Sequence, residues 1–155
     1  MKTIFASIIL LSCLSFTVLA QNPVTGTKTV PMVPSGQMPS ISSVLTELET
    51  GITPESFSSA FKSDDWTKEV AALKPTDITG ASSLLGQLGS GLNPVSLVKG
   101  FSAKEWMSKL KSATTMSSVA SEAETLVKNI NPSAFKSGFD VSKITSSLNM
   151  LKGVK

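Results

Sequence analysis

The chain has 155 residues, 41% of them hydrophobic and 16% charged, and its 14 basic against 11 acidic side chains give a net charge of +3. These values fit one modest globular domain and exclude a fully disordered chain. The sequence contains no His and no Tyr, and every basic residue is Lys. It therefore lacks the side chain best suited to proton transfer near neutral pH, and the Arg fork that binds phosphate or carboxylate.

The first 20 residues are typical of a secretory signal peptide. Lys2 supplies a positive start, an apolar run follows from Ile4, and small residues precede an expected cleavage between Ala20 and Gln21. Lipid anchoring at Cys13 is a minor alternative. Cleavage removes Lys2 and the only cysteine, so the mature chain carries a net +2 and no disulfide. We expect a secreted or periplasmic protein held together by its own core.

Residues 21–39 contain four prolines and two glycines and show no helical periodicity. This composition predicts a flexible, Pro-rich N-terminal tail before an all-helical domain over residues 40–155. A docking peptide for another protein's groove is the alternative interpretation of the tail.

A repeated pattern begins at residue 38. When the chain is aligned on the prolines at positions 54, 94 and 132, similar residues recur in column after column. All seven aromatic residues of the expected mature chain fall in three of these columns. The pattern predicts three copies of one unit. The copies span about residues 38–74, 78–113 and 116–152.

Each copy is predicted to contain three helices. In the first copy, a helix begins after Ser40 and ends where Gly51 adopts a left-handed cap, and a short second helix carries Phe57 and Phe61. A third helix begins near Ser63 in this copy and near Ser102 or Asp140 in the others. The turn and N-cap positions are Thr53, Pro54, Asn93, Pro94, Asn131 and Pro132. The core anchors are Phe57, Phe61, Trp66, Leu97, Phe101, Trp106, Phe135, Phe139 and Ile144.

The predicted fold class is all-α, because no alternating pattern indicates a strand. One unit of about 40 residues cannot bury its own apolar stripe, whereas stacked units can. The sequence therefore predicts three tandem three-helix units of about 40 residues, arranged either as a short solenoid or as a compact helical bundle.

No catalytic, cofactor-binding or metal site is predicted. The acidic group Asp64, Asp65 and Glu69 lacks the spacing of a calcium loop and fits the start of a helix. Glu122 and Glu124 do not form a paired-carboxylate site. The Ser-x-x-Lys spacings are not far above chance and lack accompanying catalytic motifs. They occur at Ser59/Lys62, Ser96/Lys99, Ser108/Lys111 and Ser133/Lys136.

Charge is divided between the two halves of the chain. Residues 36–98 carry a net −4, whereas residues 99–155 carry a net +5. A basic half can meet an anionic surface, an acidic polymer or the acidic half of another copy. We expect no nucleic-acid partner, because the aromatic residues that would stack on bases are assigned to the core.

The favoured function is a secreted or periplasmic, non-enzymatic helical repeat protein that acts as a binding module. Its partner is then an unknown protein or an anionic surface. The first alternative is a membrane-surface or lipid-binding protein that uses Lys-rich amphipathic helices in peripheral contact with the bilayer. A Ser/Lys hydrolase is the least favoured alternative, since a nucleophile also needs a positioned base and oxyanion donors.

Overall fold

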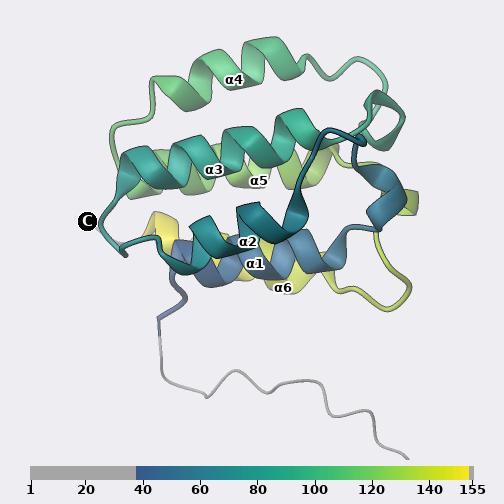
Figure 1. Ribbon diagram of the computed structural model, residues 1–155. Coiled ribbons are helices and arrows are strands. Elements are labelled where there is room, and N and C mark those ends of the chain that lie inside the picture. The colour runs from purple at the N-terminus through teal and green to yellow at the C-terminus, as the bar shows by residue number, and fades with distance from the viewer. Residues whose placement is uncertain (1–37, 154–155) are drawn as a thin grey trace, which may run out of the picture. The chain divides into compact units, whose positions relative to one another are not determined.

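The computed structural model describes residues 38–153, which form six α-helices and three short 3-10 helices without a β-strand (Figure 1). The α-helices are α1 (Ile41–Gly51), α2 (Ser63–Ala71), α3 (Ile78–Gly91), α4 (Ala103–Lys111), α5 (Met116–Asn129) and α6 (Val141–Lys152). The 3-10 helices are η1 (Pro54–Ser56), η2 (Pro94–Ser96) and η3 (Pro132–Ala134). The all-α prediction is confirmed. The expected signal peptide, its Ala20–Gln21 junction and residues 21–37 of the tail lie outside the described residues.

Side-chain caps determine where most of the helices begin. Ser40 and Thr115 each form a capping box, in which the hydroxyl accepts from the backbone N–H three residues later. Asp77, Ser102 and Asp140 cap α3, α4 and α6 in a similar way. The predicted start of the first helix after Ser40 is confirmed.

The helices alternate along the chain between three inner helices (α1, α3 and α5) and three outer helices (α2, α4 and α6), each of which packs against two inner ones. α3 contacts both α1 and α5, while α2 lies against α1 and α3, and α4 lies against α3 and α5. The last helix, α6, lies against α5 and also returns to α1 (Figure 1). The last helix, α6, therefore packs against the first helix, α1.

The three 3-10 helices are joined to one another by backbone hydrogen bonds. Each bond links the residue before one 3-10 helix to the last residue of another. The N–H of Thr53 donates to the Ala134 carbonyl (2.9 Å), that of Asn93 to Ser56 (2.8 Å) and that of Asn131 to Ser96 (2.8 Å). The main chain at this end of the molecule therefore satisfies its polar groups without a sheet.

Tryptophan anchors the outer helices to their neighbours. Trp66 of α2 and Trp106 of α4 are each 2% exposed. Their indole N–H groups donate to the carbonyls of Leu84 in α3 and Glu122 in α5, both at 2.9 Å. Ile144 is buried at the corresponding place in α6. The remaining predicted anchors are half-buried and pack against this core: Phe57, Phe61, Leu97, Phe101, Phe135 and Phe139.

The prediction of a short second helix that carries Phe57 and Phe61 in the first unit, and its equivalents in the other units, is wrong. After three 3-10 residues, Phe57 has an extended backbone (φ −93°, ψ 149°). The next N–H, of Ser58, donates to the carbonyl of Gly91 in α3 (2.7 Å) and so is unavailable to a local helix. The rings of Phe57 and Phe61 nevertheless stack, with centroids 4.5 Å apart.

Each of the three prolines is the first residue of a helical turn, as predicted, but the turn is a 3-10 helix. The N-cap positions before the prolines are Thr53, Asn93 and Asn131. Only Asn131 caps its turn through the side chain, by accepting from the Ser133 N–H. The amide of Asn93 instead donates to the carbonyls of Glu55 and Phe57.

The left-handed cap predicted at Gly51 is also wrong, because Gly51 is the last residue of α1 and an extended residue follows it. Among the described glycines, positive φ occurs at Gly100 and Gly138. Gly51 is required for close approach: a methyl group there would overlap the ring of Phe139. Gly91 bears the same relation to the ring of Phe61.

We expect Trp106→Ala to lower the free energy of unfolding by about 3–5 kcal/mol, because it leaves a cavity and removes the indole hydrogen bond to the Glu122 carbonyl. Urea titration followed by circular dichroism measures the loss. Ser108→Ala, on the exposed side of the same helix, is the matched control. Equal stability of the two variants would contradict the core role of Trp106.

Candidate functional site

An apolar hollow lies where α1, α3 and α5 begin. It has a volume of about 500 Å³, within the range typical of ligand pockets. Ser40 and Thr76 supply its few polar groups. Its apolar lining comes from Met38, Pro39, Ile41, Ile78, Met116 and Leu151. We call this hollow the apolar cleft.

The apolar cleft exists because α1 is one turn shorter than its neighbours. α1 has 11 residues, whereas α3 and α5 have 14 each. Three residues of helix rise about 4.5 Å. In α1 the corresponding residues are Met38, Pro39 and the cap Ser40, which are not helical. The first turns of α3 and α5 therefore project beyond α1 and wall an open space.

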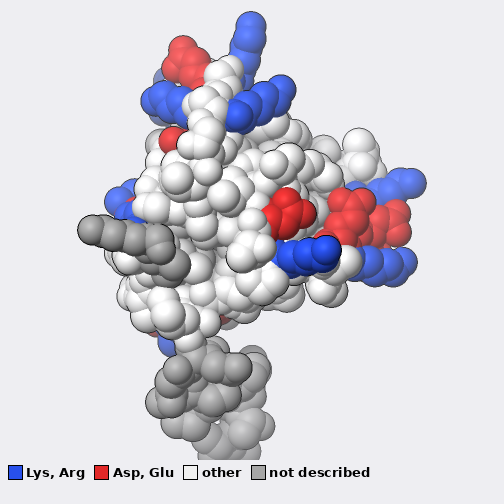
Figure 2. Space-filling model, turned by 90° about the vertical axis from the view of Figure 1, so that its left-hand side faces the viewer, with Lys and Arg blue, Asp and Glu red and all other residues white. Residues whose placement is uncertain are grey.

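Among the residues that the structure describes, no charged side chain lines the cleft. Figure 2 views the end at which α1 and α3 begin, and the charged side chains gather mainly toward the top and the right of this face. Met38, which lines the cleft, is 68% exposed. Large exposed apolar side chains around a hollow are typical of a binding surface.

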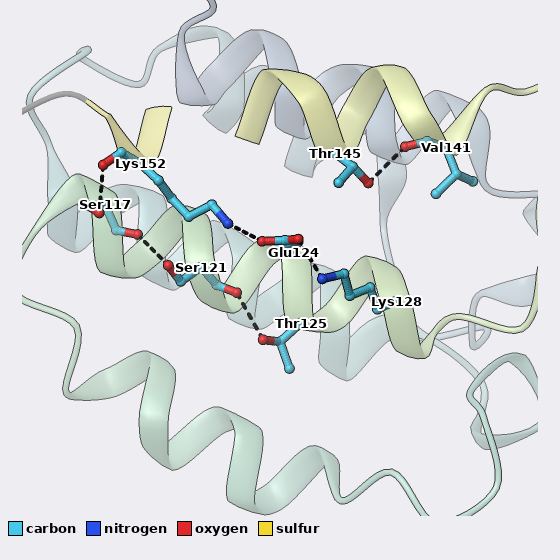
Figure 3. Close-up of polar contacts among 8 residues, drawn as sticks. All are labelled: Ser117, Ser121, Glu124, Thr125, Lys128, Val141, Thr145 and Lys152. Carbon is cyan, nitrogen blue, oxygen red and sulfur yellow. Dashed lines mark hydrogen bonds and ion pairs between the residues drawn. The ribbon is translucent and has the colours of Figure 1, made fainter. Parts of the chain in front are cut away.

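A polar clamp between α5 and α6 holds the Leu151 side of the cleft (Figure 3). The hydroxyl of Ser117 donates to the backbone carbonyl of Lys152 (3.1 Å). The ammonium of Lys152 pairs with the carboxylate of Glu124, which also pairs with Lys128 at 2.6 Å. These contacts fix the last turn of α6 against α5.

The clamp shifts the protonation of Glu124. Hydrogen bonds from Lys128 and then Lys152 hold the pKa of the Glu124 carboxyl below its ordinary value, and partial burial opposes them only in part. The carboxylate therefore stays charged to lower pH in the folded chain than in the unfolded chain.

The residues weighed for chemistry are not brought together. Ser96 is buried and donates to the Ser56 carbonyl (3.1 Å), while Ser108 and Ser133 bond within their own turns. Within residues 38–153, no hydrogen bond joins a Ser hydroxyl to a Lys ammonium. Asp64 and Asp65 occupy the first turn of α2, as the helix-start interpretation predicts. The described residues contain no group of three or more His, Cys, Asp or Glu placed to hold a metal ion.

Sequence reasoning missed the apolar cleft. The signal was present, because Met38, Ile78 and Met116 occupy one column of the alignment, sixteen residues before each proline. All three line the cleft. A column of apolar residues at the starts of helices is ordinarily interpreted as core. Here the three side chains line an open hollow, because the first helix lacks the corresponding turn.

Comparison with known proteins adds no relative. No protein-family model matches the chain, and no curated protein or solved structure matches it. Within residues 38–153, none of the helices combines the length and the apolar character needed to cross a bilayer. The candidate site is therefore defined by the geometry of this chain.

The lowered pKa of Glu124 predicts a pH dependence of stability. The charged carboxylate stabilises the fold fully above its unfolded pKa of about 4.3, and this stabilisation is lost as pH falls through the lower folded value. Urea unfolding at pH 7 and at successively lower pH measures how the free energy of unfolding changes with pH. We expect Glu124→Gln to be less stable at pH 7 and to show a smaller loss on acidification.

Glu55→Gln is the control, since Glu55 is exposed and makes no ion pair among the described residues. If Glu124→Gln left the change of unfolding free energy with pH unaltered, the stabilising role of the clamp would be contradicted.

Proposed function

We propose that the protein is a secreted or periplasmic, non-enzymatic binding module that engages a partner protein through the apolar cleft. The observation that carries the proposal is an open, apolar hollow of about 500 Å³ with the exposed side chain of Met38 in its lining. Burial of such a surface is the main driving force of association.

The scaffold of this module is three copies of one unit that close on themselves, in place of an open solenoid. Each unit is then a helix, a 3-10 turn and a second helix. Support comes from the helix contacts, in which every outer helix lies against two inner ones and α6 returns to α1. The hydrogen bonds among the three 3-10 turns support the same arrangement.

The geometry of the cleft favours one kind of partner segment. The space corresponds to one missing helical turn, and the apolar starts of α3 and α5 flank it. A turn of helix with an aliphatic side chain fits such a site, as in other helix-in-groove complexes. The scarcity of polar groups in the lining disfavours an extended strand, which would need partners for its backbone.

The lipid-binding alternative has less support. It requires apolar helix faces that are offered to the bilayer. In the described residues those faces are turned inward, and the large exposed apolar side chains are Met38, Val95, Val98 and Met150. Sedimentation with anionic liposomes at low salt distinguishes the two functions: co-sedimentation of the folded protein would favour the lipid-binding alternative.

The non-enzymatic part of the proposal has its own test. We expect no covalent labelling by a fluorophosphonate probe, because the Ser-x-x-Lys spacings do not place a hydroxyl beside an ammonium among the described residues. Gel fluorescence after incubation measures the labelling. Labelling of native protein that is absent after heat denaturation would contradict this expectation.

The binding surface is tested by Met38→Asp. Met38 is 68% exposed, so the substitution places a charge at the cleft with little effect on folding. Val95→Asp is the matched control, because Val95 is 81% exposed but lies in η2, outside the cleft. Each variant is used to capture partners from the native exported fraction, with a photo-crosslinking residue at position 76.

We expect the crosslinked partner to be lost with Met38→Asp and retained with Val95→Asp. Its crosslinked peptide should be apolar and helix-forming. Equal capture by both variants would place the binding surface elsewhere.

A further inference from the structure

A second, polar cleft lies between α4 and α5. Its volume is about 400 Å³. Phe101 and the edge of the buried Trp106 contribute its apolar wall. The polar side chains that line it are Lys99, Ser102, Glu105, Lys109, Thr125 and Asn129. We call it the α4–α5 cleft.

A corresponding hollow of about 470 Å³ lies between α2 and α3, and the two differ in an informative way. Measured from the prolines that begin η1 and η2, Phe61 corresponds to Phe101 and Glu69 to Lys109. Gly91, where the Phe61 ring rests on α3, corresponds to Asn129. The α4–α5 cleft therefore has an amide where its counterpart has only backbone, and a cation where its counterpart has an anion.

The polar groups of the α4–α5 cleft include both donors and acceptors. Lys99 and Lys109 line it, and neither forms an ion pair among the described residues. The Nδ2 group of Asn129 donates to the Thr125 carbonyl (2.8 Å), which leaves its Oδ1 atom as an acceptor. The carboxylate of Glu105 supplies further acceptor sites.

We propose that the α4–α5 cleft binds a sugar acid, that is, a hydroxylated organic carboxylate of the uronate type. The two ammonium groups bind the carboxylate through charge-assisted hydrogen bonds. Asn129 and Glu105 accept from the hydroxyl groups of the ligand, and the face of the Phe101 ring packs against its carbon skeleton. This inference does not depend on the apolar cleft.

A simple anion uses only part of this site. Acetate or an inorganic anion satisfies the lysines but offers no hydroxyl donors to Asn129 or to Glu105. The Glu105 carboxylate in addition repels an anion that brings no compensating donor. A neutral sugar leaves the net positive charge of Lys99, Lys109 and Glu105 uncompensated. A ligand that carries a carboxylate and hydroxyls together satisfies both sets of groups.

The experiment is a titration of the ¹⁵N-labelled protein from residue 21 onward, followed by amide chemical shifts. Sodium glucuronate is the probe, and glucose and sodium acetate at equal concentration and ionic strength are the comparison ligands. We expect saturable shifts at Phe101 and Asn129 with glucuronate alone. A uronate trisaccharide in a parallel titration distinguishes the free acid from a residue of an acidic polysaccharide as the source.

Two substitutions test the residues. Lys109→Glu copies the charge of the α2–α3 hollow and is expected to weaken glucuronate binding by about tenfold or more. Asn129→Gly copies Gly91 of the α2–α3 hollow. It removes the Oδ1 acceptor and is expected to weaken the saturable shifts with glucuronate. Glu69→Lys, in the α2–α3 hollow, is the matched control and should leave binding at Phe101 unchanged.

Spectra of each variant without ligand establish that the fold is retained. Equal shifts with acetate and glucuronate would reduce the site to a general anion patch and overturn the proposal. Absence of saturable shifts with both the monomer and the trisaccharide would overturn it as well, as would full binding by Lys109→Glu.

Discussion

The structure depends on the contact between its last helical segment and its first. The Lys136 N–H donates to the carbonyl of Gly51 (2.9 Å), and the Thr53 N–H donates to that of Ala134. Phe139 lies against Gly51, where any larger residue would hold it away. Each backbone bond contributes only about 1 kcal/mol net. Their position matters more, because they bring α6 onto α1 and cover a face that would otherwise meet water.

Closure has consequences for both candidate sites. With α6 against α1, the apolar faces of all six helices are turned toward one core, which compensates for the absence of cysteine in residues 38–153. Hollows remain where this packing is imperfect. The missing turn of α1 opens the apolar cleft, and an Asn in place of Gly beside Phe101 accompanies the α4–α5 cleft.

The two clefts suit different chemistry on one rigid scaffold. The apolar cleft is a hydrophobic surface whose Leu151 side is fixed by the Glu124–Lys152 clamp. The α4–α5 cleft combines cations with hydroxyl acceptors. Both proposals are consistent with a chain that lacks His and Arg, because neither requires proton transfer or a bidentate cation.

The sequence by itself determined the helical class, the start of the first helix at Ser40 and the burial of Trp66 and Trp106, because apolar periodicity and capping residues act locally. It could not determine the extended backbone at Phe57 or the helical state of Gly51. The backbone at Phe57 depends on a hydrogen bond from Ser58 to Gly91, and the need for Gly at position 51 comes from the ring of Phe139; both contacts join residues distant in sequence. The clefts, too, were decided only by tertiary structure, since an apolar column such as Met38, Ile78 and Met116 becomes a site only where its neighbours fail to cover it.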